Sequence, residues 1–269
     1  MLTFKQKIQN IIFPLGSIQK IYKGYLKGYK MKVTTNSLWS PLIGGWEPTM
    51  QKIMVNVVKP GQTVYDLGAN NGLHGLLLSR LVGEKGLVVN FEPFAANIIE
   101  IDENYEMNKI VNYRNVQAAV ADKEGIVNFS MGVHSKQGAI SEDNSDDSDC
   151  VKVPSITLDS FIDAGNPGPS FIKMDIEGAE GAALSGFSKN IEKYFPDMVI
   201  ELHNPVQDRE VGYFLKSHQY KAYRFDPFKA LHFTEVSDFS KGCPEPEGIW
   251  GTIFCFGPSR QLKDFTFDK

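Results

Sequence analysis

Several apolar runs of this chain end in acidic or imidazole side chains that could act together. The densest group is Lys173, Asp175 and Glu177, where one such run ends. Carboxylates here can attract a positively charged ligand or orient a nucleophilic hydroxyl. Glu201 and His203 end another run, and a histidine is a candidate base near neutral pH. The alternatives are a structural ion pair for Lys173 and a backbone-bonded imidazole at the rim for His203.

A glycine-rich turn after a third run offers a place for a ligand. Its sequence is Asp66-Leu67-Gly68-Ala69-Asn70-Asn71-Gly72. Gly68 can take a positive φ, and neither glycine has a Cβ to keep a ligand from the backbone. Asn70 stands where a dinucleotide fingerprint needs glycine, and no Lys-Ser/Thr pair follows for a phosphate loop. The alternative is an ordinary buried strand that ends in a glycine turn.

Glu92 ends a fourth run, 24 residues after Gly68. A carboxylate at that place can accept hydrogen bonds from both ribose hydroxyls of an adenosine. Its neighbours in Phe91-Glu92-Pro93-Phe94 make a merely solvated acid the weaker interpretation. Small side chains at Ala119 and Val120 would leave room for a flat adenine, although a simply buried strand accounts for them nearly as well.

Strands and helices that alternate along the chain would bring these groups to one edge of a sheet. Hydrophobic periodicity predicts a parallel, helix-covered sheet closed by antiparallel strands near the C-terminus. Ligands of such sheets bind outside the carboxyl ends of the strands. The predicted strands are 63–67, 87–92, 116–120, 126–131, 171–175, 198–203, 220–225 and 248–256, and the predicted helices are 49–58, 95–108, 157–162, 177–185, 209–217 and one that starts at 73.

Composition excludes several classes of protein. The net charge of −4 gives no global footprint of nucleic-acid binding. Three cysteines without metal-type spacing favour a reducing compartment, so we expect a cytoplasmic protein. No apolar run approaches transmembrane length. The acidic stretch 137–149 lacks the spacing of an EF-hand and is interpreted as a mobile surface loop.

Residues 1–46 differ from the rest of the chain in charge. They hold seven lysines and no acid, whereas the remainder holds 21 basic and 32 acidic residues, a balance of −11. Apolar residues recur between the lysines at roughly helical spacing, and Pro14 with Gly16 predicts two helices. The segment either meets anionic lipid or an anionic substrate, or it is a helical cap whose lysines are merely solvated. We favour the cap, because the periodicity is interrupted.

The glycine turn resembles motif I of Rossmann-like S-adenosylmethionine (SAM) methyltransferases, and further motifs resemble the FkbM family of these enzymes. Those motifs are Phe91-Glu92-Pro93, Ala119-Val120, Thr157-Leu158-Asp159, Lys173-Met174-Asp175-Ile176-Glu177-Gly178-Ala179-Glu180 and Glu201-Leu202-His203. The resemblance covers about residues 47–215. Departures from the family pattern at Asn71 and His74 put the methyl acceptor in doubt rather than the cofactor.

The resemblance implies an α/β fold of the Rossmann-like class I methyltransferase type, with a mostly parallel seven-stranded sheet and helices on both faces. We expect residues 47–269 to form the methyltransferase domain, and residues 1–46 to form a basic amphipathic N-terminal helical segment that the family pattern does not include. The resemblance also implies SAM as methyl donor and O-methylation of a hydroxyl on a small molecule or glycan. The alternatives are an NAD(P)-linked oxidoreductase and a non-catalytic nucleoside-binding module.

Two sets of site residues follow, and the sequence does not demand a metal. It leaves the acceptor, the base and the oligomeric state open. Candidates for the chemical step are Asp175, Glu177 and His203. Candidates for binding the cofactor are Asp66, Gly68, Ala69, Asn70, Asn71, Gly72, Glu92, Pro93, Phe94, Ala119, Val120 and Asp175.

Overall fold

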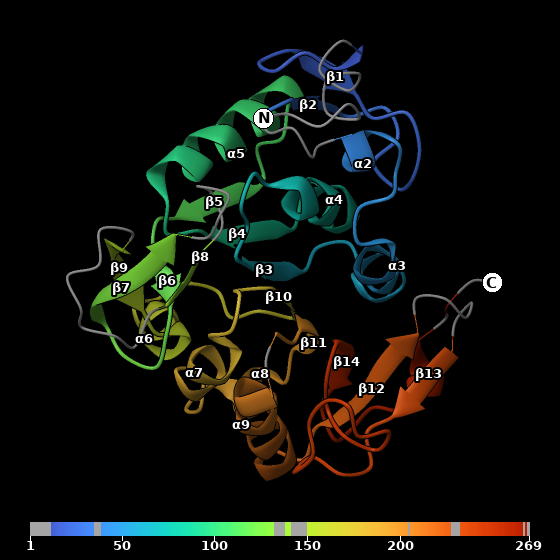
Figure 1. The fold of residues 1–269 in the computed structure, drawn as a ribbon, viewed down its shortest axis with the longest axis vertical. Helices are drawn as coiled ribbons and strands as arrows, with labels where there is room; N and C mark the ends of the chain where they lie inside the picture. The colour runs from blue at the N-terminus through green and yellow to red at the C-terminus, as the bar shows by residue number, and fades with distance from the viewer. Residues whose placement is uncertain are drawn as a thin grey trace.

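A central sheet with helices on both faces forms the body of the protein in the computed structural model (Figure 1). Its strand order is β13-β12-β14-β11-β10-β3-β4-β5. The five strands β5, β4, β3, β10 and β11 run parallel to one another. The other three strands pair antiparallel: β14 with β11, β12 with β14, and β13 with β12. The structure describes residues 12–34, 39–131, 138–140, 150–203, 205–226, 232–265 and 267.

The strands of this sheet follow the predicted apolar runs, with one addition. The prediction of an α/β fold with a mostly parallel sheet is confirmed, and β13 adds an eighth strand at the edge that the sequence did not suggest. The bounds are β3 (Thr63–Leu67), β4 (Leu87–Phe91), β5 (Tyr113–Val116), β10 (Phe171–Met174), β11 (Asp197–Glu201), β12 (Lys221–Asp226), β13 (His232–Glu235) and β14 (Thr252–Phe256).

Two hydrophobic clusters cover the two faces of the sheet. Side chains alternate along a strand, so Val64 belongs to one cluster and Tyr65 to the other. The first cluster includes α3 (Pro48–Val57), α4 (Leu73–Val82) and α5 (Ala95–Met107). The second includes α6 (Leu158–Asp163), α7 (Glu180–Ser185), α8 (Ile191–Tyr194) and α9 (Pro205–Ser217). No helix of the described ranges is both long enough and apolar enough to span a bilayer.

A second, four-stranded sheet corrects the prediction for residues 116–120. The predicted single strand is divided: β5 ends at Val116 in the main sheet, and β6 (Ala119–Val120) pairs with β9 (Cys150–Ile156). The order of this small sheet is β6-β9-β7-β8, with β7 (Gly125–Met131) and β8 (Gly138–Ile140). Strand β8 falls inside the stretch interpreted as an acidic loop, and the acids 142–149 lie outside the described residues.

A β-hairpin replaces the second helix predicted for the N-terminal segment. Strands β1 (Ile18–Lys20) and β2 (Lys30–Lys32) pair antiparallel beside α5 (Figure 1), and α2 (Trp39–Leu42) follows. The backbone N–H groups of Lys30 and Lys32 donate to the side chains of Asn108, the C-cap of α5, and Asn104 within α5. These partners are more than 70 residues away, which is why local spacing suggested a helix. Residues 1–11, where the first helix was predicted, lie outside the described residues.

We call residues 12–34 the N-terminal hairpin. Four of its apolar side chains, Ile21, Leu26, Met31 and Val33, are buried in the same cluster as α3 and α4. This shared cluster packs the hairpin against the remainder of the chain. A domain boundary at residue 46 stays a prediction.

Candidate active site

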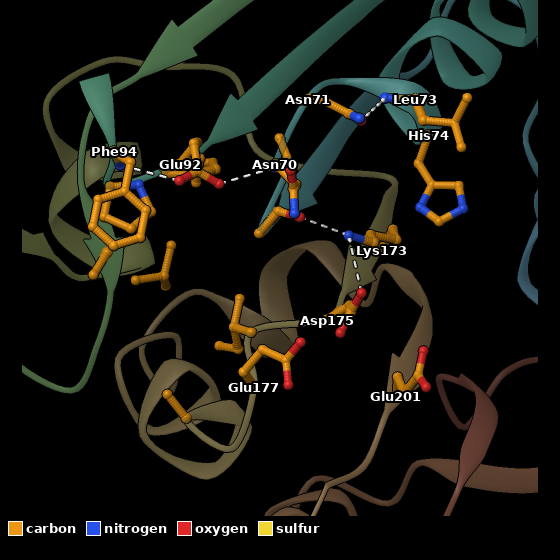
Figure 2. Close-up of a pocket in the computed structure, with 18 of the residues that line it drawn as sticks. Asn70, Asn71, Leu73, His74, Glu92, Phe94, Lys173, Asp175, Glu177 and Glu201 are labelled. Carbon is orange, nitrogen blue, oxygen red and sulfur yellow. Dashed lines mark hydrogen bonds and ion pairs between the residues drawn. The ribbon is translucent and has the colours of Figure 1, made fainter. Parts of the chain in front are cut away.

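A cavity of about 350 Å³ opens at the carboxyl ends of β3, β4, β10 and β11. That size lies within the range of small-molecule sites, about 300–1,000 Å³. Figure 2 shows Glu92 and Asn70 on one side of it and the carboxylates of Asp175, Glu177 and Glu201 on the other. Its lining includes Thr34, Trp46, Glu47, Gly68, Ala69, Asn70, Asn71, His74, Glu92, Pro93, Phe94, Ala118, Ala119, Val120, Phe129, Lys173, Asp175, Glu177, Glu201 and His203.

The glycine turn after β3 is held against two neighbouring strands. Gly68 has φ +74°, and a Cβ there would lie 2.0 Å from the carbonyl oxygen of Asp175. The N–H groups of Gly68 and Ala69 both donate to the carbonyl oxygen of Phe91. Only glycine therefore fits at position 68, and the turn presents Asn70 and Asn71 to the cavity.

Two predicted cofactor residues lie below the cavity rather than on its surface. Asp66 is fully buried, and Gly72 is the N-cap of α4, where a Cβ would lie 2.9 Å from the ring of Tyr105 and 3.2 Å from Ile101. Neither residue belongs to the lining of the cavity. The other predicted cofactor residues all do, and so do the three predicted for the chemical step.

Glu92 is a buried carboxylate that three donors orient. One oxygen accepts from the backbone N–H of Asn70 at 2.9 Å, and the other accepts from the backbone N–H of Phe94 at 3.0 Å (Figure 2). The second oxygen also accepts from Asn97 Nδ2 at 3.0 Å. Burial raises the pKa of Glu92 to about 7, although these hydrogen bonds oppose the rise. A carboxylate has about four acceptor positions, so one remains for a ligand.

Lys173 is the cation beneath the cavity. Its side chain is 2% exposed, and Nζ lies 3.1 Å from Asp66 Oδ1 and 3.9 Å from Asp175 Oδ2. It also donates to the carbonyl oxygen of Gly68 at 2.9 Å. Burial alone would lower the pKa of Lys173, but the surrounding carboxylates raise it, so the amine stays charged. The structural ion pair that the sequence left open is present, and it also connects β10 to the glycine turn.

His203 is held by a buried partner that the sequence did not identify. Glu180 at the start of α7 is fully buried, and its Oε1 lies 2.9 Å from His203 Nδ1. The other ring nitrogen, Nε2, lies 3.4 Å from Asp175 Oδ1 and 3.6 Å from Glu177 Oε2. Burial would lower the pKa of His203, but the hydrogen bond and charge of Glu180, with Asp175 and Glu177, raise it to about 9.

Glu47 is a second residue that sequence reasoning missed, since nothing around it marks a site. It precedes α3 with φ +39°, and its Oε2 lies 3.4 Å from His74 Nε2. Burial and the nearby Asp175 raise the pKa of Glu47 to about 8. Burial likewise raises the pKa of Glu201. This side of the cavity thus holds more carboxylates than its cations balance, and a positively charged ligand would relieve their repulsion.

Two overlapping sets of side chains could also close around a metal ion. They are Asp175, Glu177 and His203, and Glu47, Asp175 and Glu201. Within each set, the candidate ligand atoms lie within 4.8 Å of one another. The donors suit a divalent cation, but a sulfonium or ammonium group would meet the same carboxylates.

Comparison with protein-family models gives a match for this chain. The family model described as the methyltransferase FkbM domain matches residues 66–222. No curated protein matches the chain.

Solved methyltransferases resemble this chain at low identity. Methyltransferase FkbM from Methylobacillus flagellatus is 19% identical to this chain, with a TM-score of 0.47. The match covers 78% of this chain and 51% of the Methylobacillus protein, so this chain spans about half the length of that protein. The SAM-dependent O-methyltransferase of Thermotoga maritima is 12% identical (TM-score 0.44; 94% and 82% covered). Fibrillarin of Aeropyrum pernix, solved with natively bound SAM, is 10% identical (TM-score 0.43; 77% and 73%).

The family model spans more than half of the chain, and its matched residues contain the glycine turn, Glu92, Asp175 and His203. The chain therefore belongs to the FkbM family of SAM-dependent methyltransferases.

Proposed function

We propose that the protein transfers the methyl group of SAM to a hydroxyl oxygen of a small molecule or glycan, and that His203 accepts the proton of that hydroxyl. The observation that carries the proposal is the orientation of His203. Its Nδ1 faces the buried carboxylate of Glu180, so in the neutral imidazole Nδ1 carries the hydrogen and Nε2 carries the lone pair. That lone pair lies among Asp175 and Glu177, which line the cavity.

The residues of the cavity fit SAM. Glu92 keeps an acceptor position for a ribose hydroxyl, and Phe94, Ala119 and Val120 offer an apolar wall for adenine. The carboxylates on the opposite side suit the positive sulfur and amino group (Figure 2). The family match also favours methyl transfer over the NAD(P)-linked alternative.

When bound, SAM supplies a methyl group on a positively charged sulfur. Transfer of that methyl group to the hydroxyl oxygen of the acceptor would form a carbon–oxygen bond as the carbon–sulfur bond breaks, with S-adenosylhomocysteine as the leaving group. His203 Nε2 takes the proton, and the Glu180 carboxylate stabilises the imidazolium that forms. Asp175 and Glu177 can hold the hydroxyl in line, and positioning should supply much of the rate enhancement, because the donor is already activated.

A panel of acceptors tests the hydroxyl assignment. The protein is incubated with methyl-labelled SAM and phenols or methyl glycosides, each paired with an analogue that carries an amino group instead of one hydroxyl. We expect label to enter the hydroxyl compounds as an ether that survives mild base. Transfer only to the amino analogues, or only as a base-labile ester, would refute O-methylation of a hydroxyl.

Glu92→Gln is expected to weaken the binding of SAM and of S-adenosylhomocysteine by about 10- to 100-fold, the effect of losing a hydrogen bond to a charged group. The NH₂ group of the new amide must also face one of the backbone N–H groups that now donate to Glu92. Two donors then face each other, so the melting temperature should fall as well. Calorimetry on the wild type, Glu92→Gln and the exposed Glu84→Gln checks this. Equal affinities in all three proteins would remove Glu92 from the binding site.

A further inference from the structure

We infer that the solvent-facing side of the N-terminal hairpin, residues 12–34, docks onto the surface of a membrane that carries anionic lipids. The inference concerns a surface outside the cavity and does not depend on the identity of the methyl acceptor.

Exposed large apolar side chains are concentrated in the hairpin. Twelve large hydrophobic side chains of the described residues are exposed, and five of them lie within this stretch of 23 residues: Ile12, Leu15, Ile18, Tyr22 and Tyr25. The other seven are spread from residue 43 to residue 213. Single exposed apolar side chains need no explanation, but a concentration of them marks an interaction surface.

This exposure is not the result of a loose tail. Ile21, Leu26, Met31 and Val33 of the same segment are buried in the core, at 1–3% exposure. Asn108, the C-cap of α5, accepts from Lys30 N and donates to Lys30 O, which ties β2 to the body. The segment is thus anchored through its inner side, and its outer apolar side chains cannot turn inward without breaking that packing.

The register of the hairpin places lysines around the exposed isoleucine. Ile18 pairs with Lys32, and Lys20 pairs with Lys30, so these four side chains share one face. The opposite face carries Met31, which is buried. Lys32 is the member of this face that forms an ion pair, with Glu103 at 2.7 Å.

The remaining lysines of the hairpin offer unpaired positive charge. Lys20, Lys23, Lys27 and Lys30 are exposed, and none of them forms an ion pair within the residues that the structure describes. Residues 1–46 contain no acid, and the rest of the chain has a balance of −11. An anionic surface would therefore attract the hairpin and repel the remainder, which orients the whole molecule.

Anionic lipid fits this combination better than nucleic acid does. Aliphatic side chains lower their free energy by burying apolar surface at the boundary between headgroups and acyl chains, and tyrosine side chains prefer the level of the headgroups. Each lysine near an anionic bilayer is expected to raise the partition coefficient about fivefold. In Figure 1 the hairpin lies at one end of the molecule, away from β12 and β13, so a flat surface can reach it.

Vesicle flotation with the full-length protein tests the inference. Vesicles of phosphatidylcholine alone are compared with vesicles that contain about one-third phosphatidylserine, at low and at physiological salt. We expect binding to the anionic vesicles that falls as salt rises. Lys20→Glu/Lys23→Glu/Lys27→Glu should lose at least 100-fold in partition coefficient. Lys85→Glu/Lys123→Glu/Lys152→Glu, an equal charge change on exposed lysines elsewhere, should lose less than threefold.

The apolar contribution has its own variant. Ile18→Ser/Tyr22→Ser keeps every charge and is expected to lower binding to anionic vesicles by about 10-fold or more, whereas binding to heparin should not change. Retained SAM affinity and an unchanged circular dichroism spectrum show that each variant is folded. The inference is overturned by equal binding to both kinds of vesicle, by equal losses in the two lysine variants, or by a serine variant that binds like the wild type.

Discussion

Replacing His203 with alanine is expected to lower kcat for methyl transfer by about 10²- to 10⁴-fold, the usual contribution of a positioned base. The affinity for SAM should change little, because Glu92 and the glycine turn are untouched. His218 forms a similar pair with Glu192, at 3.1 Å, and neither residue belongs to the cavity lining. His218→Ala is thus the matched control and should keep the wild-type rate.

The pH dependence of the rate gives a sharper test of the same role. A base acts in its deprotonated form, so kcat/KM should rise with pH, reach half of its plateau near the His203 pKa of about 9 and level off above it. Glu180→Gln can still accept from Nδ1 but removes the negative charge. We therefore expect the His203 pKa to fall, the rising limb to move to lower pH, and the plateau rate to fall as the imidazolium loses its partner.

Two outcomes would contradict the assignment of His203. One is a His203→Ala protein that retains the wild-type kcat. The other is a rising limb that Glu180→Gln leaves in place, since a merely structural contact between Glu180 and the imidazole would not set the pH profile. Asp175 or Glu177 would then become the candidate base.

The second large effect is on stability. Lys173→Met is expected to lower the free energy of unfolding by about 3–5 kcal/mol, the cost of breaking a buried ion pair from one side. The reason is that Asp66, fully buried, would lose its nearest cation, so its carboxylate would either stay unpaired or take up a proton, and both cost free energy. Urea unfolding of the folded variant measures the loss.

A double-mutant cycle separates the pair from simple loss of packing. Asp66→Asn/Lys173→Met should be more stable than Lys173→Met alone, because no unpaired carboxylate remains buried. Lys189→Met, which breaks an ion pair between exposed side chains, should have a far smaller effect. A double variant less stable than Lys173→Met would show that the methylenes, rather than the charge pair, carry the stability.

Short-range patterns were enough for the parallel part of the fold. Strands such as β3 and β4 are short apolar runs between turn signals, and the turn after β3 needs the positive φ of Gly68. Such features are encoded within a few residues, so they can be recognised without the fold. The edge strand β13 and the division between β5 and β6 depend on pairing partners elsewhere, and the sequence did not predict them.

The part of the site that lies at the ends of the parallel strands was also predictable from local patterns. Residues at strand ends, such as Glu92, Asp175 and His203, reach the cavity because the carboxyl ends of parallel strands meet at one edge. Asp66 lies one residue before the end of β3, and its side chain forms a buried ion pair with Lys173 instead of lining the cavity. Their roles in binding and in the chemical step stay predictions for the experiments above.

The sequence by itself determined the fold class, the glycine turn and the acids of the strand ends, because each follows from local periodicity and backbone freedom. Only the tertiary structure decided that Glu180 orients His203, that Glu47 joins the cavity, and that β2 pairs as a strand beside α5. Those outcomes rest on hydrogen bonds and burial between residues far apart in the chain, and no local pattern encodes which distant partner a side chain will meet.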